Sequence, residues 1–450
     1  MASIAPVKDD RLSPRRTAFA SMIGTMVEWY DYFIFGTASA LVFSRIFFSS
    51  LDPTTGVLAS FATFGVAFVA RPVGAIVFGH FGDRLGRKKM LVLSLLMMGV
   101  GTVVVGLLPT YDQVGLLAPT LLVLCRLLQG LAVGGEWGGA VLMAVEHAPK
   151  NKRAFYGSWP QMGNPIAMIL ATLTFLAVVQ LPEDDFLAWG WRIPFLASSI
   201  MVVIGLYIRL KVLESPAFVR MKEQGEQSRV PIVEILRYHW KPALIGMATT
   251  AAPNIPYYIG AVFIISYAAQ RTGMDTNLML IGLCIASFVE VFTIPASAIL
   301  ADRIGRKKVL MGGAFFVAAF AFPFFWLVDS GNPVLIVLAL CLILGVGHAT
   351  TYSTQATFFS ELFPTKVRYT GTSVAYHLGG MITSGPVPLV ATALVVWAGS
   401  SVPLSIYMIV GAFISIGAIR LARESYQDEI NAAPKASLKD RTPSVSSRHI

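Results

Sequence analysis

Long apolar stretches, separated by short polar or basic segments, recur along the whole chain. Each has about 20 residues or more, enough for a helix to cross about 30 Å of hydrocarbon. The pattern predicts an all-α integral membrane protein. Its twelve transmembrane helices are expected at residues 17–48, 56–80, 89–109, 115–147, 152–181, 189–213, 240–270, 276–300, 308–329, 332–362, 367–398 and 402–423.

Composition supports this class and excludes several others. The 450 residues are 55% hydrophobic and only 13% charged, whereas a soluble protein carries about twice that share of charge. The first apolar run is too long for the core of a signal peptide, so we interpret it as an uncleaved span. The three cysteines and six histidines are scattered, which predicts neither a disulfide framework nor a metal site. Walker motifs, nucleotide fingerprints and catalytic triads are absent from the sequence, so we expect no enzyme and no cofactor.

The distribution of basic residues predicts the orientation in the membrane. The net charge is +10, and 30 of the 35 Lys and Arg fall in the segments that share a side with both termini. The segments on the other side hold only Arg45, Arg192 and Arg271. By the positive-inside rule, both termini are cytoplasmic. We therefore expect a multi-pass protein of the cell membrane, in a bacterium, with the lipid bilayer rather than a nucleic acid as the partner of its basic surface.

Two motifs repeat at nearly the same offset. Asp-Arg-Leu-Gly-Arg-Lys-Lys at 83–89 returns as Asp-Arg-Ile-Gly-Arg-Lys-Lys at 302–308, 219 residues later. The Glu, Pro and Arg of segment 146–153 return in segment 361–368, 215 residues later. The chain is therefore interpreted as a duplicated six-span unit. The predicted parts are a cytoplasmic tail at 1–16, a helix bundle at 17–213, a cytoplasmic linker at 214–239, a second bundle at 240–423 and a disordered cytoplasmic tail at 424–450.

Parallel six-span repeats are typical of alternating-access transporters, and here the residues also resemble a known family. The two Asp-Arg-x-Gly-Arg-Lys-Lys loops, and the fourth span from Arg126 to Trp137, resemble signature motifs of the major facilitator superfamily. Further motifs are similar to those of its metabolite:proton symporter family. They are Glu28-Trp-Tyr-Asp31, Arg71-Pro-Val-Gly74, Gly135-Glu-Trp-Gly138, Gly157-Ser-Trp-Pro-Gln161, Trp189-Gly-Trp-Arg-Ile-Pro194 and Glu214-Ser-Pro216.

The resemblance implies two pseudo-symmetric halves of six helices and the uptake of a small organic acid or zwitterion together with a proton. Members of the family carry shikimate, dicarboxylates and proline or betaine. The run 136–149 is most similar to shikimate-type carriers, and the tail lacks the long heptad pattern of the osmosensing betaine type. Two alternatives stay open: a proton antiporter that exports metabolites or drugs, and, more remotely, a membrane sensor that does not transport.

Five charged side chains lie within the predicted spans of the first half. They are the acids Glu28, Asp31 and Glu136 and the bases Arg71 and Arg126. A charge at the bilayer centre costs roughly 2.5–3.5 kcal/mol on insertion scales, and arginine does not give up its proton. Counted this way, one negative charge is in excess, so we expect a carboxyl to be protonated or a cation to bind. This imbalance is the physical case for proton coupling.

The resemblance suggests which carboxyl carries the proton. In related sugar–proton symporters, an Asp of the first span faces the Arg that opens the fourth-span motif, and the matching residues here are Asp31 and Arg126. Glu28 is the next candidate. The alternative is a permanent salt bridge between spans one and four that never titrates.

Arg71 is the main candidate for binding a substrate carboxylate. It precedes Asp83 by 12 residues, which places it about 18 Å from the cytoplasmic end of its helix. Its partner is either a substrate or an acid of the first span, and both possibilities stay open. Glu290 occupies the equivalent position in the second half. Whether the two meet is also left open.

Polar and aromatic residues of the central spans are the other candidates for the solute site. The prolines of Ala252-Pro-Asn-Ile-Pro-Tyr-Tyr258 predict a break in the seventh span, and such breaks often mark binding sites. The alternative for each residue is packing or hydrogen bonding between helices. The candidates are Tyr32, Gln129, Trp137, Gln161, Asn164, Asn254, Tyr257, Tyr258, Tyr352, Gln355 and His377.

The basic loops are predicted to close the cytoplasmic side. In the superfamily they act as a latch between the halves, and the match carries this role to Asp83, Arg87, Asp302 and Arg306. The alternative is that the loops serve only as topology signals. The repeated helix ends add Glu146, Arg153, Glu361 and Arg368 to the candidates. We expect a monomer to be the working unit.

Overall fold

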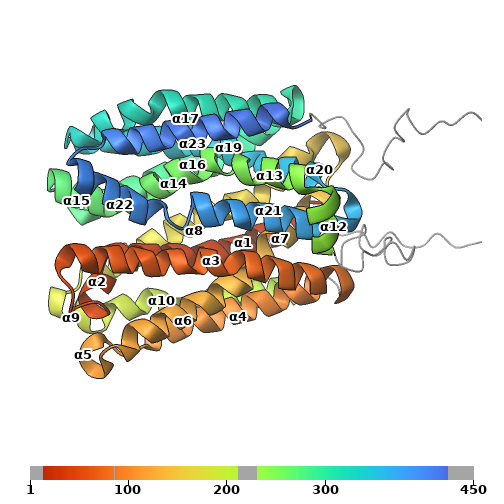
Figure 1. The fold of residues 1–450 in the computed structure, drawn as a ribbon. Coiled ribbons are helices and arrows are strands. Elements are labelled where there is room, and N and C mark those ends of the chain that lie inside the picture. Colours follow the sequence, from red (N-terminus) through yellow and green to blue (C-terminus); the bar gives the residue numbers. More distant parts are fainter. Residues whose placement is uncertain (1–13, 86, 211–230, 424–450) are drawn as a thin grey trace, which may run out of the picture.

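The computed structural model of the protein describes residues 14–85, 87–210 and 231–423, without the side chains of residues 83–85 and 87. Every regular element in these ranges is a helix, and the long helices run side by side (Figure 1). Parts of four predicted segments fall outside the description: residues 1–13 of the first tail, residues 86 and 211–213 of the first bundle, residues 214–230 of the linker, and the whole tail at 424–450.

The helices of the first half extend to residue 210. They are α1 (Pro14–Leu41), α2 (Phe43–Ile46), α3 (Pro53–Leu85), α4 (Arg87–Leu107), α5 (Tyr111–Val114), α6 (Leu117–Val133), α7 (Glu136–Glu146), the 3₁₀ turn η1 (Lys150–Lys152), α8 (Arg153–Val179), α9 (Glu183–Ala188), the 3₁₀ turn η2 (Gly190–Arg192) and α10 (Ile193–Leu210).

The helices of the second half begin within the predicted linker. They are α12 (Pro231–Tyr238), α13 (Trp240–Thr249), α14 (Ala251–Tyr258), the π-helix η3 (Ile259–Phe263), α15 (Ile264–Thr272), α16 (Thr276–Ile304), α17 (Arg306–Asp329), α18 (Pro333–Leu342), the π-helix η4 (Ile343–His348), α19 (Ala349–Ser353), α20 (Gln355–Leu362), the 3₁₀ turn η5 (Thr365–Val367), α21 (Arg368–Thr383), α22 (Val387–Ala398) and α23 (Val402–Leu421).

Ten helices in the described ranges are long and apolar enough to cross a membrane. Two further rods, α1 and the run α13–α15, complete the twelve predicted spans, although they fall below that threshold of apolarity. Their low apolarity has a simple cause, because α1 carries Glu28 and Asp31 and the other rod carries Asn254, Tyr257 and Tyr258. The predicted all-α membrane fold is confirmed, and its two least apolar spans are those expected to meet the solute.

Local chemistry determines several helix ends. Asn332 caps α18, since its side-chain oxygen accepts from the backbone N–H of Val334 at 2.9 Å, and Pro333 occupies the first helical position. Gly305 separates α16 from α17 with φ of 105°, a conformation that side chains disfavour. This turn lies in the second copy of the repeated basic motif.

Glycines let α6 and α7 approach their neighbours closely. A Cβ on Gly74 of α3 would lie 2.0 Å from the carbonyl oxygen of Leu131, and one on Gly134 would lie 2.2 Å from that of Arg71. The small residues of the Gly134–Gly139 segment thus let it pack tightly against other helices. Because α3 and α6 touch backbone to backbone, Arg71 is held beside the helix that carries Arg126.

The seventh span is interrupted as the prolines predicted, but not at the prolines themselves, because α14 contains both Pro253 and Pro256 and continues directly into η3. The interruption lies earlier, between α13 and α14 at Thr250, where the carbonyl of Thr249 loses the N–H donor that residue 253 would otherwise provide. The π-helix that follows widens the turn by one residue, as is common near functional sites.

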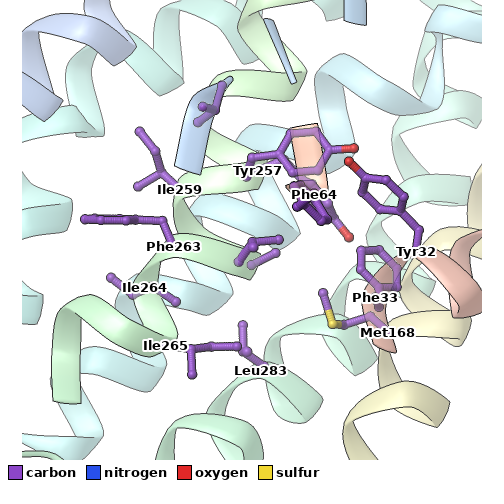
Figure 2. Close-up of a cluster of buried hydrophobic side chains, with 14 of the residues drawn as sticks. Tyr32, Phe33, Phe64, Met168, Tyr257, Ile259, Phe263, Ile264, Ile265 and Leu283 are labelled. Atoms are coloured by element: carbon purple, nitrogen blue, oxygen red, sulfur yellow. The ribbon is translucent and has the colours of Figure 1, made fainter. Parts of the chain in front are cut away.

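The two halves meet along α8 and α16 and along α3 and α21. Aromatic side chains fill the space between them. Figure 2 shows part of this buried cluster, to which Tyr32 and Phe64 of the first half and Tyr257 of the second all belong. The ring centroids of Tyr32 and Tyr258 are 6.0 Å apart. The centre of the bundle is therefore a packed aromatic layer with polar groups at its edges.

Replacing Gly74 by alanine is expected to destabilise the α3–α6 contact. The added methyl group would meet backbone, which cannot rotate away, so we expect a loss of about 1–3 kcal/mol, typical of overpacking. The measurement is the melting temperature of the purified protein in detergent. The control is Gly417→Ala, because a Cβ at Gly417 meets nothing within 4 Å. Equal melting temperatures for the two variants would contradict the close contact.

Candidate functional site

Asp31 lies in a hydrogen-bonded network that joins α1, α4 and α6. Gln129 donates from Nε2 to both carboxylate oxygens at 3.2 Å, and Thr102 donates to Oδ1. Arg126 Nη1 lies 3.9 Å from Asp31 Oδ2 and donates to Gln129 Oε1 at 2.9 Å. All four side chains are buried. The structure thus brings together the predicted Asp31–Arg126 pair, and Gln129 bridges its two members.

Both interior arginines of the sequence analysis lie over aromatic rings. The guanidinium carbon of Arg126 is 3.9 Å from the ring centroid of Phe35, and that of Arg71 is 4.1 Å from Phe68 and 4.8 Å from Tyr32. Such contacts stabilise a cation by roughly 0.5–2 kcal/mol, less than a buried charge requires. Among the described residues, Arg71 has no carboxylate partner, although it is only 3% exposed.

Glu136 pairs with Arg209, a residue that the sequence analysis did not consider. Arg209 belongs to the last turn of α10, and its Nη2 donates to Glu136 Oε1, while Ser94 donates to Oε2 at 3.1 Å. The guanidinium passes over Gly24, where a Cβ would lie 2.3 Å from Nη2. Glu136 is therefore a fully buried and fully bonded carboxylate. A role for Glu136 in proton coupling stays a prediction, and its ion pair with Arg209 argues against that role.

The predicted excess of one negative charge is wrong. Arg209 was counted among the basic loop residues because it lies at the end of its span, but it is only 6% exposed and points into the bundle. Three arginines therefore accompany the three acids. The numbers of positive and negative charges are therefore equal, but not every acid lies beside an arginine. Glu28 is 3% exposed, forms no ion pair within the described residues, and its Oε2 has no hydrogen-bond partner there.

In the second half, Glu290 meets His348 rather than Arg71. Its Oε1 lies in hydrogen-bond contact with His348 Nδ1, which answers the question that the sequence left open. The centroid of the His348 ring lies 4.2 Å from that of Tyr257, whose hydroxyl donates to Asn164 Oδ1 of the first half at 2.8 Å. No local pattern predicts the Glu290–His348 pair, since 58 residues separate its members.

Trp137 and Gln161 join the two halves through satisfied bonds. Trp137 Nε1 donates to Gln161 Oε1 at 3.0 Å, and Gln161 Nε2 donates to the backbone oxygen of Tyr352 at 3.0 Å. The indole also stacks on Tyr376, with centroids 3.7 Å apart and planes 9° apart. These two side chains have no free polar group in this conformation, so their contacts would have to open for a solute to bind them.

Other candidates carry buried polar atoms without a partner among the described residues. They are the Asn164 Nδ2 group, both amide atoms of Gln355 and both ring nitrogens of His377. Buried polar groups in proteins are nearly always hydrogen-bonded, so each of these is open to a solute or to water. With Arg71, they are the best-placed candidates for a polar ligand.

Asn254 has a different position. Its Nδ2 donates to Thr383 Oγ1 at 3.0 Å, and Thr383 also bonds the hydroxyl of Thr250 at 2.9 Å, so this group links α13, α14 and α21 within one half. The packing alternative fits Asn254 better than contact with solute. Tyr258, in contrast, lies against Phe68 at 5.8 Å, in the aromatic layer beside Arg71.

The predicted latch residues of the second half contact the first half. Asp302 accepts hydrogen bonds at 3.0 Å from the backbone N–H groups of Ala154 and Phe155, in the first turn of α8 that Arg153 opens. A carboxylate at a helix N-terminus is stabilised by the helix dipole. Arg306 Nη2 lies 3.2 Å from Asp302 and 3.6 Å from Glu361.

A second latch contact crosses between the repeated helix ends. Arg368 Nη1 lies 3.4 Å from Glu146 Oε1, and both side chains are buried. The pair connects the end of α7 to the start of α21, so it joins the halves at the same end of the bundle as Asp302. Asp83 and Arg87, the other predicted latch residues, have side chains outside the described part of the structure.

Comparison with known proteins relates this arrangement to a family. The sequence matches the Major Facilitator Superfamily model over residues 21–388. It is 40% identical to the shikimate transporter of Escherichia coli over 91% of this chain and 95% of that protein. It is 42% identical to the inner membrane metabolite transport protein YhjE of the same species, over 85% and 88%. The proline/betaine transporter of E. coli is 31% identical over 92% and 84%.

Solved structures show the same fold. A crystal structure of a D-xylose–proton symporter superposes with a TM-score of 0.70 at 17% identity, covering 92% of this chain and 99% of that one. The proton:xylose symporter XylE bound to 6-bromo-6-deoxy-D-glucose gives a TM-score of 0.70 at 15% identity, covering 92% and 96%. At these identities the likeness concerns the arrangement of helices.

Removing the Arg209 side-chain charge is expected to destabilise the folded protein. Arg209→Gln would leave Glu136 buried without its cation, which costs about 3–5 kcal/mol when one partner of a buried pair is lost. The measurement is the melting temperature in detergent. The double variant Glu136→Gln/Arg209→Gln should recover most of the loss. Arg271→Gln, at an exposed position, is the control. A melting temperature that Arg209→Gln leaves unchanged would show that the Glu136–Arg209 pair does not stabilise the fold.

Proposed function

Because the chain belongs to the Major Facilitator Superfamily and is a transporter rather than an enzyme, we propose that it imports a small organic acid or zwitterion together with a proton. The proposal is supported by its similarity to shikimate and metabolite transport proteins and, in fold, to proton symporters of xylose. The bacterial membrane location, with both termini cytoplasmic and a monomer as the working unit, is part of the same proposal.

One observation carries the choice of an acid as solute. Arg71 is a buried cation beside the aromatic layer between the halves, and no carboxylate of the described residues lies within ion-pair distance of it. A desolvated guanidinium without a counter-ion in contact is expensive, and its planar fork matches a carboxylate. A substrate carboxylate would supply the missing charge. Gln355 and His377, with their unpartnered polar atoms, would bond the rest of the molecule.

Asp31 is our choice for the group that carries the proton. Its Arg126 partner cannot lose a proton at any pH that the protein meets, so Asp31 is the member of the pair that titrates. The 3.9 Å separation and the bridging Gln129 leave room for the pair to tighten or loosen as the halves move. Glu28, without a bonded partner, is the second candidate.

The latch would make this binding part of an alternating cycle. Asp302 on the first turn of α8, and Arg368 on Glu146, hold the halves together at the end that the charge pattern predicts to be cytoplasmic. Opening that side requires both contacts to break. A proton antiporter would use the same parts in the other direction, so the direction of solute movement under an imposed pH gradient separates the two functions.

Asp31→Asn is expected to uncouple the solute from the proton. Proteoliposomes with the variant should fail to accumulate labelled shikimate when the outside is acidic, yet should still exchange it in counterflow, because the empty and loaded carrier can still reorient. The control is Asp112→Asn, which removes an exposed carboxylate at the end of the bundle opposite to the latch contacts. Loss of both activities together with loss of folded protein would instead favour a permanent salt bridge.

Arg71→Gln is expected to weaken binding of acids rather than stop the cycle. Losing a buried charge–carboxylate contact costs about 2 kcal/mol or more, so the half-saturation concentration for shikimate counterflow should rise roughly 30-fold. Arg71→Lys should recover only part, because an ammonium cannot match the bidentate geometry. Unchanged half-saturation in Arg71→Gln would exclude this residue as the carboxylate receptor.

A further inference from the structure

We propose that Glu290 and His348 form a second proton-binding site, in the half of the transporter opposite to Asp31. Both side chains are buried, with 1% and 2% exposure, and they contact each other directly across α16 and η4. The coupling scheme above uses neither residue. The site therefore adds a titratable group to the second half, where Cys341 stands at the position 215 residues after Arg126.

This proposal rests on which side chain supplies the positive charge in each buried carboxylate pair. The other two buried carboxylate pairs of the membrane interior, Asp31–Arg126 and Glu136–Arg209, both use arginine, which keeps its proton. Histidine is the side chain whose charge changes in the physiological pH range. With a proton on the ring, the Glu290–His348 pair is neutral overall. When the proton leaves, a buried carboxylate remains whose Oε2 has no partner among the described residues.

In the described part of the structure, the elements packed against η4 are α14, α16, α17, α18 and α19. Apart from the pair itself, their ionisable side chains away from the helix ends are tyrosines and cysteines, which stay neutral between pH 5 and 8. The charged residues of α16 and α17 other than Glu290 stand at the helix ends. The neutral groups are Tyr257, Tyr258, Cys284, Cys341 and Tyr352, and the end charges are Asp302, Arg303, Arg306, Lys307, Lys308 and Asp329.

The position of the Glu290–His348 site also allows a change in its protonation to affect contacts with the other half. The His348 ring lies between Tyr257, at 4.2 Å, and Tyr352, at 4.6 Å. The hydroxyl of Tyr257 donates to Asn164 of α8, and the backbone oxygen of Tyr352 accepts from Gln161 of α8. A movement of the ring on losing its proton would therefore act on two residues that bond α8, in addition to the Asp302 contacts with the first turn of that helix.

The π-helix explains how His348 reaches this position. The extra residue in the turn Ile343–His348 rotates the ring toward α16. Gly345 permits the approach, since a Cβ there would lie 2.8 Å from Val289 Cγ1 on α16, next to Glu290. Both the backbone and the small side chain are thus arranged around the pair.

The test is a pH titration of the purified protein in nanodiscs, followed by infrared difference spectroscopy with ¹⁵N-labelled histidine. This experiment needs no solute, so its outcome is independent of whether the proposed uptake is correct. We expect one buried imidazolium to lose its proton as the pH is raised, accompanied by a shift of a carboxylate band. The imidazole change should vanish in His348→Gln, and the carboxylate shift should vanish in both His348→Gln and Glu290→Gln.

The matched control is His147→Gln, because His147 is a half-buried histidine that bonds only the Met143 backbone oxygen, at 2.8 Å. It should keep both spectral changes. Spectra of the two site variants that match the wild type would overturn the proposal, as would a wild-type spectrum with no buried imidazolium. If His348→Gln does not fold, Glu290→Gln and the wild-type titration still decide the question.

Discussion

The cost of placing charge in a membrane governs this structure. Six charged side chains lie deep in the first half, and each must find a counter-charge, a hydrogen bond or an aromatic face within the bundle. Two acids succeed: Glu136 with Arg209, and Asp31 with Arg126 and Gln129. Glu28 and Arg71 are left without bonded partners among the described residues. A proton would neutralise Glu28, and a substrate carboxylate would pair with Arg71. The arrangement therefore suits a proton-coupled carrier of acids.

Close packing keeps the charged residues together within each half and leaves the two halves able to move relative to each other. Backbone contacts at Gly74 and Gly134 hold Arg71 against the helix of Arg126, so the first half keeps its charges together. Between the halves, the contacts are few and polar at the latch and aromatic in the centre. Polar contacts of this kind exchange readily for water, whereas the packing within each half does not. The halves can therefore move as units around a fixed set of charges.

Much of this could be predicted from the sequence, since hydropathy, the basic loops and the repeated motifs predicted the helical membrane fold, and the resemblance to the superfamily supplied the latch residues. The Asp31–Arg126 pair followed from resemblance. Arg209 was missed because hydropathy shows where a helix ends but not where a long side chain points. The Glu290–His348 pair was missed because no local pattern connects residues 58 positions apart. The prolines of the seventh span correctly indicated an irregular helix, but the shift to a π-turn depends on the neighbours that pack against it.

We have proposed that protonation of a buried carboxyl in the first half is coupled to solute uptake. The decisive experiment records external pH together with the uptake of a labelled organic acid, in proteoliposomes of the wild-type protein. The account predicts that adding solute makes a weakly buffered exterior more alkaline, as protons enter with it, and that an acidic exterior concentrates the solute inside. Acidification of the exterior on solute entry, or uptake with no proton movement, would contradict it.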